Sequence, residues 1–495
     1  MIRPMELASV LETIRATIAT ELKADLSSAA GRAGADALVM ILDRLLTDIT
    51  LGDDVARQQR LRWDHLAAEL ATLGLRSPQT LAAPGGGFLG DLDALQKLLD
   101  SLQQDIASQE GFTSLHEKLK HNDPQVRAWF DKATNALVEL SRNNRTVLSQ
   151  QNEAVAKTQT VDRAAALRDG LGHYLARRYP ELGSDPIQEF RLTPGGYAKQ
   201  TGLFSLHSNA SLPEKLVLRL DMPNSVTGTS VEDEYPVIER MYGLGLPVPR
   251  PVLLETDNSV LGGAFMLMTE VENAEPSGPY FPVERKGELK TGPDFGREVA
   301  RTLARLHAST REDSASAPDY HKQVHDAHMR WRTLPKGPYS LVADLGYAWL
   351  LSHPVSETRP WCAIHGDFGA HNILVRDGHL AGLIDWELSR IGDPAEDLAQ
   401  CRMMLLPGIM AWEDFVAEYL AAGGDPAACD EATVGYFCIW VFLHHLQNHI
   451  MLREKYLAGE RTDVLAANII TYYYALVAEY LAEALKIAVD AHRVE

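Results

Sequence analysis

The sequence predicts an α+β protein in which a long helical segment precedes a small antiparallel sheet and a second, mainly helical region. Apolar residues recur at helical spacing in the first 160 residues, for example from Leu7 to Leu22. From about residue 187 the pattern changes to short strand-like runs. Further along, helical character returns and is interrupted by one hairpin signal. We therefore expect a helical module, a small lobe with a sheet and a helical lobe, at residues 1–160, 161–272 and 273–495.

Length and composition are those of a multi-domain globular protein. The chain has 495 residues, of which 45% are hydrophobic and 23% are charged. No apolar run approaches the ~18–20 residues that a membrane span needs. The net charge of −20 argues against nucleic acid and anionic membranes as partners. The four cysteines form no C-x-x-C pair, which suits a reducing cytoplasm. We expect a cytoplasmic protein that acts on a small molecule.

The first 160 residues carry helical periodicity without strand signals. Apolar stripes mark helices near 7–22, 38–49, 91–108 and 124–160. Pro84-Gly85-Gly86-Gly87 breaks the pattern, and the absence of a Gly-Lys-Ser/Thr sequence after it favours a linker over a phosphate loop. Apolar stripes must be buried, so we expect a self-contained bundle. A homodimer is compatible with the sequence.

The sheet is predicted from alternating runs after residue 187. Residues 189–192, 202–206 and 215–220 are expected to form three antiparallel strands. A helix follows, and residues 264–268 form another strand. The polar residues 269–272 after it are typical of a hinge between two lobes.

A combination of motifs between His365 and Glu387 indicates the chemistry. The sequence reads H-G-D-F-G-A-H-N and then, after a predicted hairpin with an Asp377-Gly378 turn, I-D-W-E. It supplies a carboxylate, an amide five residues later and a second carboxylate thirteen residues beyond that. Phosphoryl transfer needs such groups, one to orient a hydroxyl and two to hold Mg²⁺ against nucleotide phosphates.

These motifs, with G-D-P-A-E-D-L-A at residues 392–399, resemble the aminoglycoside phosphotransferase and choline kinase family. The D-W-E sequence is similar to the branch that includes kinase domains fused to acyl-CoA dehydrogenases and hydroxyacyl-CoA kinases. The resemblance covers roughly residues 165 to 480. It implies a two-lobed protein-kinase-like fold and a phosphotransferase that uses Mg²⁺ and ATP or GTP.

The resemblance also implies a nucleotide site in the small lobe. Gly195 and Gly196 match the glycines of the phosphate loop, but Tyr197 and Ala198 replace the small residue and serine that usually follow. Lys199 compensates with charge, and Arg219 takes the place of the usual third-strand lysine. The carboxylate partner of Arg219 is expected in the next helix at Glu234, with Glu232 or Glu239 as alternatives because Pro236 disturbs that helix. The hinge contributes Met268 and Val271.

Asp367 is the expected catalytic residue, which orients the substrate hydroxyl and receives its proton. Asn372 and Asp385 are the expected Mg²⁺ ligands. Four residues are assigned supporting roles in the loop or beside the metal: His365, Glu387, Asp393 and Asp397. His445 and His449 lie one helical turn apart, and their position favours a core or pocket wall over a metal site.

Several functions remain open on the sequence alone. A hydroxyacyl-CoA or other catabolic substrate follows from the D-W-E resemblance. The excess of acidic residues after position 361 favours a cationic antibiotic, an aminoglycoside or a macrolide, as the alternative. A pseudokinase or scaffold, which would not be an enzyme, is an alternative hypothesis. It is motivated by Tyr197, Ala198 and Arg219, which replace the usual residues of the family. A metal-dependent hydrolase built on His365, Asp367 and His371 leaves the later motifs unexplained.

Overall fold

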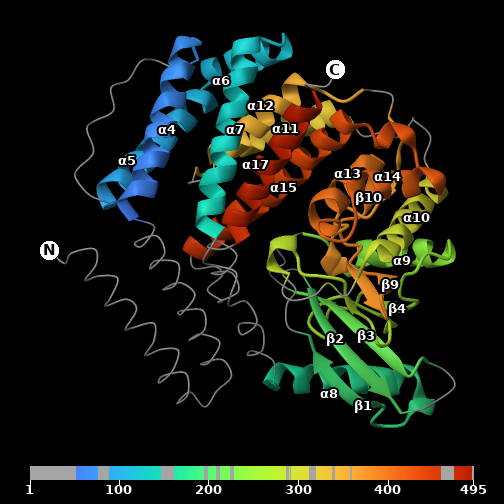
Figure 1. Cartoon of the computed structure of the whole chain (residues 1–495). Helices are drawn as coiled ribbons and strands as arrows, with labels where there is room; N and C mark the ends of the chain where they lie inside the picture. The colour runs from blue at the N-terminus through green and yellow to red at the C-terminus, as the bar shows by residue number, and fades with distance from the viewer. Residues whose placement is uncertain are drawn as a thin grey trace. The chain divides into compact units, whose positions relative to one another are not determined.

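The computed structural model describes residues 52–75, 88–145, 161–193, 199–207, 212–222, 228–285, 289, 291–311, 319–336, 340–356, 359–458 and 473–492. The helices expected at 7–22 and 38–49 and the Pro84–Gly87 break lie outside these residues. The chain forms two compact units (Figure 1), each assembled from separate stretches. One unit contains residues 1–155, 318–357 and 431–495, and the other contains residues 156–317 and 358–430.

The first unit is helical throughout its described residues. Its helices are α4 (Gly52–Thr72), α5 (Phe88–Ala107), α6 (Gln109–Lys120), α7 (Pro124–Arg145), α11 (Tyr320–Thr333), α12 (Ser340–Ser352), α15 (Glu431–Leu457) and α17 (Tyr474–Ala491). Large aromatic side chains fill the core between them. Trp129 on α7 donates from Nε1 to the Leu66 carbonyl on α4 over 2.8 Å, and Phe130 packs against Trp349 of α12 with ring centroids 5.4 Å apart. Helices from the N-terminal and C-terminal parts of the sequence therefore share one core.

A buried polar network also joins these helices. Asp344 on α12 accepts hydrogen bonds from Trp331 Nε1 at 2.6 Å and from Gln103 Nε2 at 3.0 Å. Burial raises the pKa of Asp344 to about 6. Because Gln103 lies on α5 and Trp331 on α11, one carboxyl group ties together helices distant in sequence.

The second unit begins with α8 (Val161–Arg178) and a five-stranded sheet in the order β1-β2-β3-β5-β4. The strands are β1 (Ile187–Leu192), β2 (Lys199–Leu206), β3 (Lys215–Asp221), β4 (Pro251–Glu255) and β5 (Phe265–Thr269), and all neighbouring pairs are antiparallel. The predicted strands at 189–192, 202–206, 215–220 and 264–268 are confirmed. Strand β4 was not predicted, because the Pro247-Val248-Pro249-Arg250-Pro251 run is poor in strand signals.

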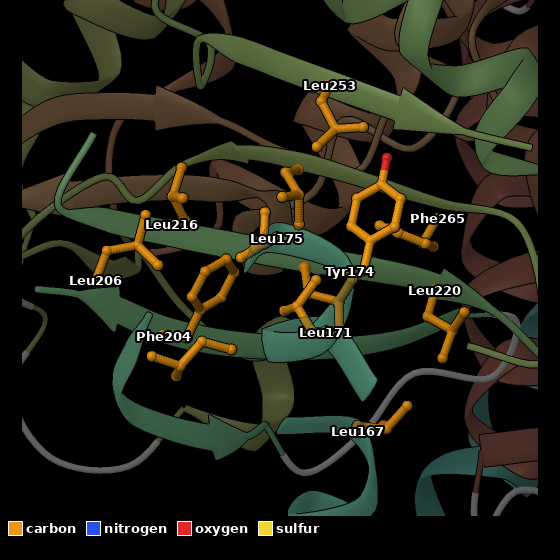
Figure 2. Close-up of a cluster of buried hydrophobic side chains, with 13 residues drawn as sticks. Leu167, Leu171, Tyr174, Leu175, Phe204, Leu206, Leu216, Leu220, Leu253 and Phe265 are labelled. Atoms are coloured by element: carbon orange, nitrogen blue, oxygen red, sulfur yellow. The ribbon is translucent and has the colours of Figure 1, made fainter. Parts of the chain in front are cut away.

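One face of this sheet carries the hydrophobic core of the small lobe (Figure 2). Alternate residues of β2 and β3, such as Phe204, Leu206, Leu216 and Leu218, pack against α8. Tyr174 of α8 meets Phe265 of β5 edge to face at 5.3 Å. Because side chains alternate along a strand, Lys199 on β2 and Arg219 on β3 point to the opposite face.

The remaining elements of this unit support the H-G-D segment. They are α9 (Val231–Gly243), β6 (Glu275–Pro276), α10 (Pro293–Ser309), β7 (Cys362–Ile364), β8 (Ile373–Arg376), β9 (His379–Leu383), β10 (Arg390–Gly392), α13 (Pro394–Gln400) and α14 (Trp412–Ala421), with a π-helical turn at Cys401–Leu405. The predicted hairpin is confirmed: Arg376 pairs with His379. Asp377 and Gly378 both have positive φ, 53° and 81°, as a type I′ turn requires. The pair β7–β10 was missed because each strand has only three residues.

The architecture is thus the predicted α+β arrangement, with an antiparallel sheet followed by a mostly helical region. Across the helices of the described ranges, none combines the length and the apolar character that a bilayer span demands.

Candidate active site

The H-G-D segment is held in place by a carboxylate from α13. Asp397 accepts hydrogen bonds from the backbone N–H groups of His365 at 2.8 Å and Gly366 at 2.9 Å. It also meets His307 Nε2 at 3.2 Å, and His307 Nδ1 lies 2.8 Å from the Tyr419 hydroxyl. Burial opposes the charge of Asp397, but these hydrogen bonds and the nearby imidazoles outweigh burial and lower its pKa.

Gly366 allows the tight course of this loop. Its φ is +81°, and a Cβ there would lie 2.4 Å from the Leu388 carbonyl oxygen, so no other residue fits without movement. Gln400 at the end of α13 completes the brace: its Nε2 donates to the Gly366 carbonyl at 2.8 Å and its Oε1 accepts from the Phe368 N–H. Sequence reasoning missed Gln400, although it lies three residues after Asp397 and hence on the same helix face.

The carboxylate of Asp367 is oriented by two side chains of its own loop. Its Oδ2 accepts from Asn372 Nδ2 at 2.9 Å and lies 3.1 Å from His371 Nε2. Asn372 Nδ2 also donates to the Asp367 carbonyl at 3.0 Å. The side chain of Asp367 is 21% exposed, so an incoming hydroxyl group can reach it.

Asn372 and Asp385 are brought together by the hairpin. The Ile384 N–H donates to the Asn372 carbonyl at 3.0 Å, which extends the β8–β9 ladder by one bond to the residue before Asp385. Because Nδ2 of Asn372 is the donor to Asp367, its Oδ1 is the atom able to face a cation. An amide oxygen and a carboxylate are the hard ligands that Mg²⁺ prefers, with waters and phosphate oxygens as the rest. This pair fits a Mg²⁺ site that a nucleotide completes.

Among the described residues, no group of three or more His, Cys, Asp and Glu side chains could hold a metal by itself. His445 and His449 contact each other within helix α15, where His449 Nδ1 lies 2.6 Å from the backbone carbonyl oxygen of His445.

Asp385 adopts an unusual backbone conformation that its neighbours enforce. Its φ is +66°, a left-handed value that a few non-glycine residues, Asp among them, tolerate. The peptide group before it is fixed because His365 Nε2 lies 3.0 Å from the Ile384 carbonyl oxygen. The peptide group after it is fixed because the Trp386 N–H donates to Glu234 Oε1 at 3.2 Å. With both flanking peptides anchored, the direction of the Asp385 carboxylate is set.

Two features define the state of His365. Its Nδ1 accepts a hydrogen bond from the Asp367 N–H at 3.3 Å, so the ring proton is on Nε2. This Nε2–H donates to the carbonyl oxygen of Ile384. Burial lowers the pKa of His365. The ring, 1% exposed, is a neutral support for the loop and does not face the reacting groups.

Arg219 connects the sheet to this loop. Its Nη2 lies 2.8 Å from Asp385 Oδ1 and 3.3 Å from Glu234 Oε2. The structure thus places Glu234, rather than the alternatives Glu232 and Glu239, beside Arg219. Ser230 caps α9 with a capping box, so Pro236 lies inside a regular helix.

The pKa values of Arg219 and Glu234 are both shifted by burial and by the neighbouring charges. Burial disfavours the guanidinium charge, but the carboxylates of Asp385, Glu234 and Glu387 overcome this effect and raise the pKa of Arg219. Burial is also the main cause that raises the pKa of Glu234 to about 7. In the described part of the chain, no acceptor lies within hydrogen-bond distance of the buried Arg219 Nε. A phosphate oxygen is the kind of group that this N–H donor fits.

A second ion pair lies next to the first. Lys199 Nζ is 2.6 Å from Glu387 Oε2 and 3.1 Å from Thr229 Oγ1. Thr229 Oγ1 itself lies 3.3 Å from Glu387 Oε2. Glu387 is therefore bound to a cation from β2. Thr229 carries no sequence signal that would have identified it.

The other predicted residues occupy supporting positions. Asp393 is the N-cap of α13, where it accepts from the Ala395 N–H at 2.9 Å and pairs with Arg359 Nε at 2.6 Å. Burial raises its pKa, with Arg359 opposing this effect. Met268 is buried at the end of β5, and a Cβ on Gly382 of β9 would lie 3.2 Å from the Val271 side chain. Gly195 and Gly196, with Tyr197 and Ala198, lie outside the described residues.

A cavity of about 550 Å³ opens near the hinge end of the sheet. Ser205 and Lys215, which face each other across β2 and β3, belong to its lining. Glu270, directly after β5, lines it as well. Lys215 lies four residues from Arg219 on the same strand and on the same face, so cavity and site share one side of the sheet.

Comparison with known proteins identifies the family. Residues 197–432 match the model of the phosphotransferase enzyme family. The mouse protein acyl-CoA dehydrogenase family member 11 is 26% identical over 239 residues, which is 46% of this chain and 30% of that protein. Viomycin phosphotransferase from Streptomyces vinaceus is 40% identical over 65 residues, 12% of this chain and 21% of that protein. The chain thus spans less than a third of the length of these relatives.

A solved structure with similarity is a putative aminoglycoside phosphotransferase from Ralstonia eutropha, at 18% identity and a TM-score of 0.46, over 66% of this chain and 99% of that one. The family match covers the segment that carries Arg219, Asp367, Asn372 and Asp385. Through residues 197–432, this chain belongs to the phosphotransferase enzyme family.

Proposed function

We propose that this protein is a small-molecule kinase that transfers the γ-phosphate of ATP or GTP to an alcohol group. The observation that carries the proposal is the arrangement of Asp367, Asn372 and Asp385 around one loop and hairpin, with Arg219 directed at Asp385. A catalytic carboxylate, two oxygen ligands and a phosphate-binding cation are the groups that this reaction uses.

In this mechanism Asp367 orients the acceptor hydroxyl and takes up its proton as the oxygen attacks. Asn372 and His371 keep the carboxylate in position through their bonds to Oδ2. Asn372 Oδ1 and Asp385 would hold Mg²⁺, which would neutralise charge on the phosphate oxygens. Arg219 turns its guanidinium from Asp385 toward the phosphates.

The base end of the nucleotide is proposed to bind in the cavity of about 550 Å³. Its size lies within the range of small-molecule sites. Strand β3 rises ~3.3 Å per residue, so the four residues from Lys215 to Arg219 span about 13 Å, a length suited to a nucleoside triphosphate.

For the acceptor, we propose a hydroxyacyl thioester or a related catabolic alcohol. The support is the D-W-E sequence at Asp385–Glu387 and the likeness to a relative whose name is that of an acyl-CoA dehydrogenase. A cationic antibiotic is the second candidate, because the acidic excess after residue 361 suits an amine-rich ligand and viomycin phosphotransferase is similar over a short stretch.

A nucleotide-consumption assay with the full chain tests both candidates. Hydroxyacyl-CoA thioesters, viomycin, aminoglycosides and macrolides are offered separately with ATP and with GTP. Acceptor-dependent consumption by the wild type and its loss in Asp367→Asn support a kinase, and the acceptor that triggers it selects the class. Nucleotide binding without consumption for any acceptor favours the pseudokinase alternative.

A further inference from the structure

The ammonium group of Lys199 is a buried cation in contact with Glu387, the last residue of the D-W-E sequence. The Lys199 side chain is 2% exposed. Oxygen atoms from three different segments surround Nζ: Glu387 Oε2 at 2.6 Å, Thr229 Oγ1 at 3.1 Å and Glu234 Oε2 at 3.9 Å. The two shorter distances are those of hydrogen bonds to an ammonium group, whereas Mg²⁺ needs oxygens at ~2.0–2.1 Å.

Lys199 and Arg219 form two neighbouring ion pairs that connect the sheet to the D-W-E sequence. Lys199 binds Glu387, Arg219 binds Asp385, and the two carboxylates are two residues apart in sequence. Both cations also approach the same atom, Glu234 Oε2, at 3.9 and 3.3 Å. The cations lie two residues apart in the β2–β3 register, since Thr201 pairs with Arg219.

A buried charge is costly unless a partner neutralises it. Glu387 is two residues from Asp385 in sequence, and it is the additional carboxylate that this segment could offer to a second divalent ion. It is 15% exposed and already neutralised by a cation that is part of the chain. Thr229 fixes this arrangement because its hydroxyl lies within 3.3 Å of both Nζ and Oε2. The oxygens of Glu387 and Thr229 thus form a cation site that the ammonium group of Lys199 already occupies.

We propose that Lys199 takes the place of a second divalent ion, so that the nucleotide complex of this protein contains a single divalent ion, held by Asp385 and Asn372. The proposal rests on the proposed nucleotide site and specifies its metal content. It also assigns Glu387 to Lys199 and not to the metal.

The test measures Mn²⁺ bound to the full chain with a non-hydrolysable ATP analogue, by electron paramagnetic resonance of free and bound Mn²⁺. Equilibrium binding of the analogue is followed in parallel by calorimetry. The wild type is expected to bind one Mn²⁺ per analogue. Two Mn²⁺ ions per analogue in the wild type would overturn the proposal, whatever the variants do.

The Lys199→Met variant removes the ammonium and keeps much of the side-chain volume. It leaves Glu387 as a buried oxygen ligand without its counter-ion, while Glu234 keeps Arg219 at 3.3 Å, so the complex is expected to gain a second Mn²⁺. The double variant Lys199→Met/Glu387→Gln should return to one ion. A Lys199→Met complex that still holds one Mn²⁺ would show that Lys199 does not occupy a metal position.

Lys132→Met is the control, because Lys132 has no place in the proposed nucleotide site. Lys132 lies on α7 and pairs with Glu69 at 2.7 Å, and its side chain is 53% exposed. Its Mn²⁺ count should equal that of the wild type. If the wild type binds no analogue at all, the proposed nucleotide site is wrong and this inference falls with it, whereas binding with two ions refutes only the inference.

Discussion

His365 and Ile384 are joined by a bond of 3.0 Å between the imidazole Nε2 and the main-chain carbonyl oxygen. This bond fixes the peptide group in front of Asp385, whose φ of +66° is otherwise unfavourable. The geometry of the site thus depends on a buried, neutral histidine that supports the Asp385 backbone. A positioning role of this kind makes a specific prediction for metal affinity.

Replacing His365 by Ala should weaken Mn²⁺-dependent nucleotide binding by about 10- to 100-fold, the range for partners that orient metal ligands. The His365→Gln variant should recover part of this loss, because its amide N–H can reach the Ile384 carbonyl. Calorimetry with Mn²⁺ and an ATP analogue measures both. Equal affinity of wild type and His365→Ala would show that Asp385 keeps its direction without this bond.

Asp367→Asn should reduce turnover by about 10² or more while nucleotide affinity stays within a few-fold of the wild type. The variant removes the proton acceptor, but Asn retains an oxygen that can accept from Asn372. Steady-state assays with the accepted substrate and calorimetry with nucleotide separate the two effects. A rate above a tenth of the wild-type value would exclude Asp367 as the catalytic group.

Asp385→Asn should abolish the Mg²⁺ dependence of nucleotide binding, because the variant loses the only carboxylate that we assign to the ion. Asn is chosen because it tolerates positive φ, so the backbone is not strained further. Asp377→Asn is the matched control, since Asp377 also has a positive φ, 53°, but lies in the hairpin turn. Titration of nucleotide with and without Mg²⁺ gives the result, and unchanged metal dependence in Asp385→Asn would identify another ligand.

The sequence predicted those parts of the fold and site that depend on local chemistry. The Asp377-Gly378 turn gave the hairpin and its register because few residues tolerate two successive positive φ angles. The loop residues Asp367 and Asn372 lie close together because they are only five residues apart. Strands β7 and β10 escaped prediction because three residues hold too little pattern.

Local sequence patterns could not predict contacts between segments that are distant in the sequence. The Lys199–Glu387 pair joins residues 188 positions apart, and the sequence assigned Glu387 a supporting role without identifying its partner. The choice of Glu234 over Glu232 and Glu239 depends on the rotation of α9 against β3, which neither spacing nor Pro236 determines. These pairings follow from tertiary packing of the two lobes around one site.

Acid should destabilise the helical unit because three of its histidines are buried in the neutral form. Burial lowers the pKa values of His328, His353 and His449 to about 4. Between about pH 6.5 and 4 the unfolded chain binds more protons at these residues, so stability falls as the pH falls through this window. Asp344 opposes the trend: its folded pKa of about 6 exceeds its ordinary value, so its contribution falls as the pH rises from about 4 to 6.

Denaturant unfolding at pH 7, 6 and 5, followed by tryptophan fluorescence, measures the balance. Three histidines against one carboxyl group predict a net loss of stability toward pH 5. His449→Gln should flatten the slope, and Asp344→Asn should steepen it because the opposing group is gone. A stability that is constant from pH 7 to 5 in the wild type would show that these histidines are not buried in their neutral form.

Removing the N-terminal residues should unfold the helical unit rather than release an active fragment. A chain that begins at residue 161 would lack α4 to α7, and the described contacts show what it would expose. Trp349 would lose Phe130, and Asp344 would lose Gln103. A buried carboxyl group without its partner costs ~1–3 kcal/mol, and uncovering the aromatic core costs more.

We expect the fragment to aggregate on expression. We also expect a marked fall in the unfolding midpoint of the full-length variant Gln103→Ala. The matched control is Gln96→Ala, because Gln96 on α5 donates a hydrogen bond to Asp100 at the surface. This variant should leave the free energy of unfolding within ~0.5 kcal/mol of the wild-type value. A soluble, monomeric fragment 161–495 with the helical content and nucleotide affinity of the parent would show that the helices around Asp344 fold without their N-terminal partners.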